Sequence, residues 1–158
     1  MEKVESFKLD HNKVKAPFVR KCCVLDGKMG DKVSKFDLRF LQPNKEAFGT
    51  AAMHGLEHLL ATYLREELDD VIDLSPMGCR TGFYLVLAGD YESKDIVDLM
   101  KEMFDFMRNF EGEVPGACAK DCGNYLDMNL NMAKYLCNKY YTEILENITD
   151  EHLIYPQS

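Results

Sequence analysis

The chain has 158 residues, of which 46% are hydrophobic and 29% charged, and its formal net charge is −8 at pH 7. This size and composition are typical of one globular domain, so we expect residues 1–158 to form a single domain. The acidic balance argues against nucleic acid as a partner, because phosphate binding needs clustered Lys and Arg. The amino terminus lacks the apolar segment of a secretory signal, and no stretch approaches the roughly 20 apolar residues of a membrane span. We therefore expect a cytosolic protein with no membrane partner.

The first half of the chain predicts a hairpin followed by a helix. Residues 18–25 are apolar enough for a strand, and residues 26–30 have the chemistry of a turn. Residues 32–41 alternate between apolar and polar side chains, as a returning strand does. From residue 50 to residue 68, leucines recur at the spacing of one helix face.

The second half predicts two shorter strands and further helices. The strands are expected at residues 71–74 and 81–89, and a helix capped by Ser93 is expected to run to about residue 110. Another helical region is expected from about residue 120 to residue 148. Consecutive strands joined by short turns favour antiparallel pairing. The sequence therefore predicts an α+β fold, a two-layer sandwich in which an antiparallel sheet packs on helices.

The most informative motif is His54-Gly55-Leu56-Glu57-His58, within the first predicted helix. At about 100° per residue, His54, Glu57 and His58 share one side of this helix, opposite the leucines. Two imidazoles one turn apart can converge on one divalent metal ion. Glu57 beside that ion can take or give a proton. Such a pattern also occurs by chance on solvated helices, but small residues near this face leave room for a substrate or a partner layer.

A catalytic metal site needs a third ligand, and Cys122 is the preferred candidate. Cys122 opens the last predicted helical region, where backbone donors and the helix dipole stabilise a thiolate. Two histidines and one cysteine leave a fourth coordination position open. Cys118, four residues earlier, is an alternative that spacing leaves open. Cys79 lies in a turn-rich loop between two strands, and Arg80 would favour its thiolate if the two side chains approach.

Taken together, these motifs resemble the S-ribosylhomocysteine lyase family, which makes the precursor of autoinducer-2 in bacteria. The resemblance runs from residue 4 to about residue 136. It rests on the segments SFKLDHNKVKAPFVR, KFDLRFLQPNK, HGLEHLLA and SPMGC and on Cys122-Gly123. It implies that His54, His58 and Cys122 bind one divalent metal ion per subunit, which is ferrous iron in this family, with zinc or cobalt as substitutes.

The resemblance also implies roles for further residues. Cys79 and Glu57 would be the two acid/base groups. The implied substrate-binding residues are Ser6, His11, Arg39 and Asp73. From the alternation of its strand alone, Arg39 would be exposed to solvent. In the family, part of each pocket comes from the partner subunit, so the resemblance implies a homodimer with two active sites at its interface.

The implied reaction makes sense of these residue types. The substrate, S-ribosylhomocysteine, carries the sulfur of homocysteine on ribose, and a thioether leaves poorly until a carbonyl lies β to it. Two aldose–ketose isomerisations move the carbonyl along the sugar through enediolates, whose charge a metal stabilises as a Lewis acid. A β-elimination then releases homocysteine, which enters the activated methyl cycle. The other product is 4,5-dihydroxy-2,3-pentanedione, the precursor of a quorum-sensing signal.

Two alternative interpretations of the motif predict other proteins. An HxxEH zinc peptidase would use the two histidines as ligands and Glu57 to activate water. That interpretation leaves Cys79 and Cys122 without a role. A metal-stabilised interaction domain would instead close a four-ligand structural site with both histidines, Cys118 and Cys122, and removal of the metal would unfold it.

Overall fold

The computed structural model describes residues 4–154, which form one sheet and three α-helices. The strands are β1 (Phe18–Asp26), β2 (Lys32–Arg39), β3 (Val71–Pro76) and β4 (Gly82–Ala88). The helices are α1 (Thr50–Glu67), α2 (Val97–Arg108) and α3 (Leu130–Tyr140). Short 3-10 or π turns occupy Glu5–Phe7, Ser93–Ile96, Tyr141–Leu145 and Asp150–Leu153. Among these residues, no helix has both the length and the apolar character that a membrane crossing needs.

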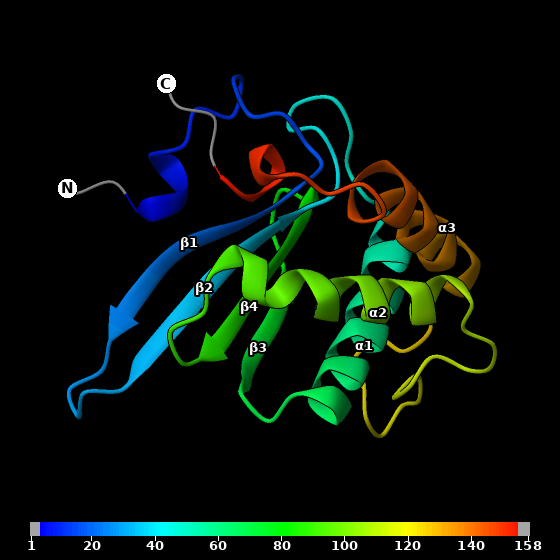
Figure 1. Cartoon of the computed structure of the whole chain (residues 1–158). Helices are drawn as coiled ribbons and strands as arrows, with labels where there is room; N and C mark the ends of the chain where they lie inside the picture. The colour runs from blue at the N-terminus through cyan, green and yellow to red at the C-terminus, as the bar shows by residue number, and fades with distance from the viewer. Residues whose placement is uncertain (1–3, 155–158) are drawn as a thin grey trace.

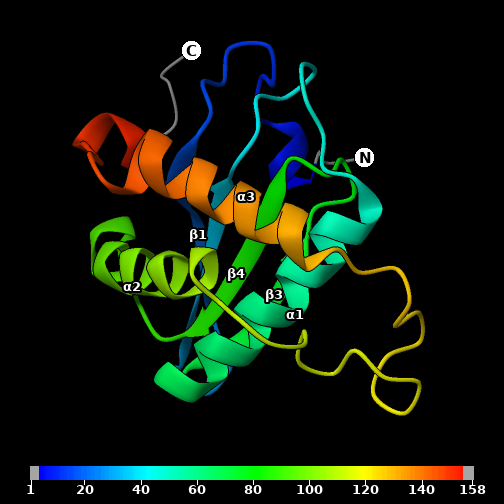
Figure 2. The same ribbon diagram turned by 90° about the vertical axis from the view of Figure 1, so that its right-hand side faces the viewer.

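The sheet has the strand order β1-β2-β4-β3, and every neighbouring pair is antiparallel. The three α-helices lie together on one face of this sheet, as the two perpendicular views show (Figures 1 and 2). The turn between β1 and β2 is closed by a hydrogen bond from Gly27 N to the Asp31 carbonyl, 2.7 Å long. The predicted α+β arrangement of an antiparallel sheet packed on helices is therefore confirmed.

The core lies between the sheet and the helices. Alternate side chains of the two central strands point into it, as the period of two in a strand requires. The buried residues of these strands on the helix side are Phe36, Leu38, Phe83, Leu85 and Leu87. The helices contribute one apolar face each, with Leu56, Leu59, Leu60 and Leu64 of α1 and Met100, Met103, Phe104 and Met107 of α2 all buried. This core fixes α1, and with it the HxxEH motif, against the sheet.

The predicted start of the second helix differs from the structure. Glu92, and not Ser93, caps this segment, through reciprocal hydrogen bonds with Asp95. The Ser93 hydroxyl instead accepts a hydrogen bond from Lys21 N, 2.8 Å away, and donates one to the Leu153 carbonyl at 3.3 Å. Ser93 therefore ties β1 to the carboxyl-terminal turn, a tertiary role that local capping rules do not reveal.

The predicted helical region from residue 120 to residue 148 is also corrected. α3 begins only at Leu130, where the Asn129 side chain accepts a hydrogen bond from Met132 N at 2.9 Å. Residues 111–129 form a long loop of turns beside α1 (Figure 2). Gly, Asn and Asp residues are frequent in this loop, and they favour turns and caps over helix interiors. The last predicted helix is therefore shorter, and Cys122 lies in the loop before it.

Candidate active site

The structure brings three predicted ligands together on α1 and the loop beside it. The rings of His54 and His58 lie one turn apart on α1, with their centroids 4.9 Å from each other. Cys122 approaches from the loop, and its Sγ lies 3.3 Å from His54 Nε2. One ligand atom from each of the three residues can be chosen so that all lie within 4.8 Å of one another. All three side chains are half-buried, as a site that must still admit a substrate requires.

The surroundings of the two histidines fit a metal site. His54 Nδ1 lies 3.0 Å from the Asp127 carbonyl, and His58 Nδ1 lies 2.8 Å from the Pro115 carbonyl. Because a carbonyl only accepts hydrogen bonds, each Nδ1 carries the proton and each Nε2 keeps its lone pair for a ligand. The 3.3 Å separation of His54 Nε2 and Cys122 Sγ is close to the roughly 3.6 Å expected across one tetrahedral zinc-like ion. This donor set therefore fits one divalent ion with an open fourth position.

Cys122 does not begin a helix, contrary to the prediction. Its backbone N–H donates to the Cys118 carbonyl at 3.0 Å, which closes a single turn. Its Sγ accepts a hydrogen bond from Asn124 N at 3.4 Å. A local backbone donor and His54 thus surround this sulfur, in place of the expected helix dipole. The alternative ligand Cys118 is exposed, donates to the Asp121 carboxylate at 3.1 Å and is not part of the three-ligand group.

The loop that carries Cys122 packs directly on α1. At Gly116, where φ is +71°, an added Cβ would lie only 3.2 Å from His58 Nδ1. Glycine is needed there both for this backbone conformation and for the close approach to the ring. At the other end of the loop, Asn129 N donates to the Ala51 carbonyl at 2.9 Å. These contacts hold the loop so that its carbonyls and its thiol meet the two histidines.

Cys79 lies at the tip of the β3–β4 hairpin, at the edge of a separate pocket. The hairpin loop is closed by hydrogen bonds from Met77 N to the Gly82 carbonyl and from Arg80 N to the Met77 carbonyl. The pocket has a volume of about 370 Å³. Its lining residues are His11, Arg39, Pro43, Asn44, Lys45, Glu46, Ala47, Cys79 and Thr81. The structure thus brings two predicted substrate-binding residues, His11 and Arg39, to the pocket of the predicted base.

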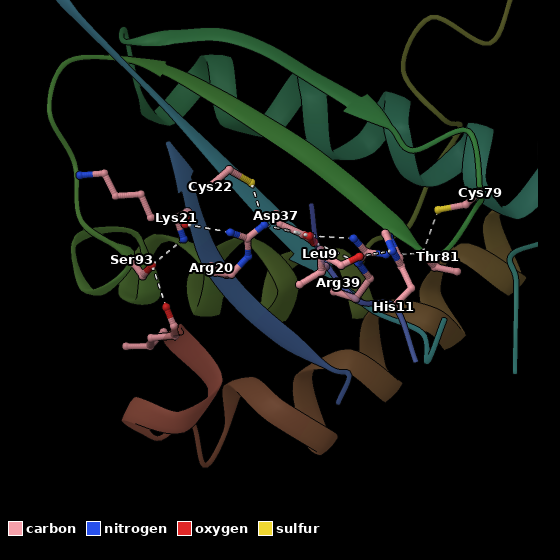
Figure 3. A network of polar contacts seen from close by, with 11 residues as sticks. Leu9, His11, Arg20, Lys21, Cys22, Asp37, Arg39, Cys79, Thr81 and Ser93 are labelled. Carbon is pink, nitrogen blue, oxygen red and sulfur yellow. Dashed lines mark hydrogen bonds and ion pairs between the residues drawn. The ribbon is translucent and has the colours of Figure 1, made fainter. Parts of the chain in front are cut away.

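A chain of polar contacts leads from the buried Asp37 side chain of β2 to Cys79 (Figure 3). Arg39 donates from Nε and Nη2 to the two carboxylate oxygens of Asp37, at 3.0 and 2.7 Å. Its Nη1 donates to Thr81 Oγ1 at 3.0 Å, and Thr81 Oγ1 lies 3.1 Å from Cys79 Sγ. Arg39 is only 2% exposed, so the solvent-facing position expected from strand alternation alone is wrong. Pairing with a buried carboxylate explains why this cation lies inside.

The cation beside Cys79 is Arg39 and not its sequence neighbour Arg80. The guanidinium of Arg80 donates to the Phe48 carbonyl at 3.1 Å. Burial opposes the charge on Arg39, but the Asp37 carboxylate, with a smaller contribution from Cys79, raises the pKa of Arg39 above its ordinary value. Arg39 is therefore a permanent positive charge near the sulfur.

The remaining predicted site residues lie apart from this chain of contacts. Ser6 is half-buried in the turn Glu5–Phe7, and Asp73 is exposed on β3. Glu57 is half-buried and lines, together with His58, a second pocket of about 460 Å³. Within the described part of the chain, neither the three predicted ligands nor Glu57 line the Cys79 pocket. The predicted site residues therefore fall into two groups within one chain, one with the predicted ligands and Glu57, the other with Cys79.

Sequence reasoning missed Asp37, Thr81 and the two carbonyls that orient the histidines. A signal existed for Asp37, because residues two apart in a strand share a face, and a carboxylate two positions before Arg39 can pair with it. Thr81 lies two residues after Cys79 in the same loop, which was a weaker signal. No sequence signal marks the carbonyls of Pro115 and Asp127, since every residue has a backbone carbonyl.

Comparison with known proteins agrees with the resemblance noted from the sequence. Residues 4–151 match the family model described as S-Ribosylhomocysteinase (LuxS). A protein of Clostridioides difficile (strain 630) named S-ribosylhomocysteine lyase is 64% identical over 92% of this chain and 93% of its own length. Proteins with the same name from Clostridium botulinum (strain Alaska E43 / Type E3) and Finegoldia magna are 60% and 52% identical. The botulinum match covers 92% of this chain and 93% of the relative, and the Finegoldia match covers 99% and 100%.

Proposed function

Because the chain belongs to the S-ribosylhomocysteinase (LuxS) family of carbon–sulfur lyases, we propose that it cleaves the thioether of S-ribosylhomocysteine. The products are homocysteine and 4,5-dihydroxy-2,3-pentanedione. The observation that carries this proposal is the group of His54, His58 and Cys122, whose ligand atoms lie within 4.8 Å of one another. The proposed location is the cytosol, where the reaction recycles homocysteine in the activated methyl cycle and supplies the autoinducer-2 precursor for quorum sensing.

In this proposal, His54, His58 and Cys122 hold one divalent metal ion per chain. The expected ion is ferrous iron, and zinc or cobalt can replace it. When bound, the ion supplies Lewis-acid stabilisation for negative charge that develops on the substrate oxygens. The carbonyls of Asp127 and Pro115 accept hydrogen bonds from the two Nδ1 atoms and so orient both rings with Nε2 available as the ligand atom, which supports this assignment.

The acid/base chemistry is assigned to Cys79 and Glu57. Each aldose–ketose isomerisation needs a proton taken from the carbon next to a carbonyl and returned to the former carbonyl carbon. Cys79 as the thiolate is the proposed base for these transfers, and Glu57 is proposed to exchange protons with the substrate oxygens. The final β-elimination removes one more carbon-bound proton and releases homocysteine. This assignment is supported by the pocket at Cys79 and by the position of Glu57 beside His58.

Ser6, His11, Arg39 and Asp73 are proposed to bind the substrate. His11 and Arg39 already line the Cys79 pocket. His11 Nδ1 lies 3.0 Å from the Leu9 carbonyl, which leaves Nε2 of this ring for the substrate. Ser6 and Asp73 lie outside this lining, so their proposed role requires the pocket to be completed by a further surface.

We propose that this further surface belongs to a second copy of the chain. One chain keeps Cys79 in one pocket and Glu57 with His58 in another, although the reaction needs all of them at one substrate. In a two-fold dimer the same two surfaces meet twice, so the Cys79 pocket of each chain can face the metal ligands of its partner. Such a homodimer has two equivalent active sites at its interface.

The proposed activity is tested by release of thiol from S-ribosylhomocysteine. Protein purified without oxygen and loaded with ferrous iron or cobalt is expected to produce homocysteine, since the ligand group fits such an ion. The same preparation stripped by a chelator should be inactive, and it should recover when the metal is returned. Failure of the folded, metal-filled protein to release thiol would contradict the proposal, and zinc-dependent peptide cleavage by that protein would favour the HxxEH peptidase.

A further inference from the structure

We propose that Thr81 is a positioning residue for Cys79. The Thr81 hydroxyl accepts a hydrogen bond from Arg39 and donates one to the Cys79 sulfur. This contact fixes the position of the sulfur at the edge of its pocket and supplies a hydrogen bond to its thiolate form. The inference rests on the proposed function, because the thiolate matters to the reaction only if Cys79 is the base.

The direction of each hydrogen bond follows from the chemistry of the groups. A guanidinium only donates, so Thr81 Oγ1 must accept from Arg39 Nη1, 3.0 Å away. A threonine hydroxyl has one proton, and this proton is then free to point at Cys79 Sγ, at 3.1 Å. A thiolate accepts it, and every group in the chain is then satisfied. The hydroxyl can donate to a thiol or to a thiolate, and this hydrogen bond is stronger when the sulfur is charged.

This chain of polar contacts is held in place at its buried end, at Asp37. Asp37, which is 1% exposed, fixes Arg39 through two hydrogen bonds, and Arg20 Nη2 lies 3.7 Å from the same carboxylate. Thr81 is itself only 4% exposed. Water therefore has little access to this donor, and a hydrogen bond from a buried donor to a charged acceptor is among the stronger ones.

The backbone explains why Thr81 reaches Arg39. Gly82 pairs with Arg39 across β2 and β4, and a Cβ at Gly82 would lie 2.3 Å from the Leu38 carbonyl. Only glycine permits this approach of the two strands. The Thr81 carbonyl also accepts hydrogen bonds from Phe40 N and Leu41 N, both at 3.0 Å. Because the backbone makes these bonds, the side chain of Thr81 can be changed without removing them.

In the proton transfer, Thr81 keeps its own proton. The carbon–hydrogen bond of the substrate breaks, its proton forms a bond to the Cys79 sulfur, and its electron pair stays on the substrate. The Thr81 hydroxyl donates to the sulfur before this step and after the proton is returned. Other charged or titratable groups also face the pocket, namely His11, Lys45 and Glu46, and they are unchanged in the variants below.

The test compares Thr81→Val, which keeps the branched shape and removes the hydroxyl, with Thr81→Ser, which keeps the hydroxyl. The readout is the rate at which iodoacetamide alkylates Cys79 in the metal-loaded protein, followed by mass spectrometry of its peptide across a pH series. The thiolate is the reactive form. We expect alkylation at neutral pH to be about tenfold slower in Thr81→Val, the size of one hydrogen bond to a charged group. At high pH, where thiols are ionised, the rates should converge.

The Thr81→Ser protein should react at nearly the wild-type rate, and kcat should follow the alkylation rates while KM changes little. Burial raises the pKa of the Cys137 thiol, so its peptide is an unreactive reference. The metal content and Tm of each variant report on folding, and Thr81→Ala replaces Thr81→Val if the latter is unstable. Wild-type alkylation in the variant without the hydroxyl would overturn the proposal, as would failure of serine to restore it. If alkylation changes as expected but no protein releases homocysteine, the proposed function fails while the role of Thr81 stands.

Discussion

Replacing Cys79 with alanine is expected to abolish homocysteine release while the metal content stays at the wild-type level. Cys79 lies outside the three-ligand group, and it contacts Thr81 at the end of the β3–β4 hairpin. Its loss removes a proton-transfer group, which typically lowers turnover by about 10²- to 10⁴-fold. Thiol release under single-turnover conditions, together with metal analysis of the same sample, measures both effects.

The matched control for this variant is Cys23→Ala, which removes a half-buried thiol from β1. This control should keep both the metal and the turnover of the wild type. Full activity of Cys79→Ala would show that another group is the base. Loss of metal from that variant would instead place Cys79 among the ligands, against the geometry described above.

Cys122→Ala is expected to lose both the metal and the activity. Its sulfur lies 3.3 Å from His54 Nε2, and two histidines alone hold a divalent ion much more weakly than a set with a thiolate. We expect the metal content to fall below about a tenth of the wild-type value and the turnover to fall by at least about 10³-fold, because metal catalysis supplies several kcal/mol. Elemental analysis after dialysis and the thiol assay measure these two losses.

Cys118→Ala is the matched control, since it removes a thiol four residues away in the same loop. The Cys118 side chain is exposed and donates to the Asp121 carboxylate, so its loss should change neither metal content nor turnover. The opposite pattern, with metal retained in Cys122→Ala and lost from Cys118→Ala, would make Cys118 the ligand. Metal loss from both variants would favour a closed four-ligand site, and in that case chelation should also unfold the chain.

The periodic parts of the chain could be predicted from sequence because their side chains repeat at a fixed interval. The leucines of α1 place His54, Glu57 and His58 on the opposite side of that helix, and the structure has them there. The alternation of residues 32–41 predicts β2, although the strand ends at Arg39. In both cases one face of the element is buried in a common core, so the pattern carries the information.

The aperiodic parts could not be predicted in this way. The loop of residues 111–129 has no repeating pattern, and its position depends on close approaches such as that of Gly116 to His58. The burial of Arg39 depends on the carboxylate of Asp37, a pair that strand alternation alone assigns to solvent. The prediction of a helix beginning at Cys122 was wrong, because the helix begins only after its cap at Asn129. Tertiary contacts decide the position of the loop and the burial of Arg39, whereas the start of α3 depends on local capping by Asn129.

We propose that each active site combines Cys79 of one chain with the metal ligands of its partner. The most direct test is a mixed dimer of Cys79→Ala and Cys122→Ala subunits, coexpressed with two different affinity tags and purified through both. Each parent is expected to be inactive, whereas the mixed dimer contains one site with every group intact and should show about half of the wild-type turnover per dimer. A doubly tagged, metal-loaded dimer as inactive as its parents would contradict the claim and place all catalytic groups of a site on one chain.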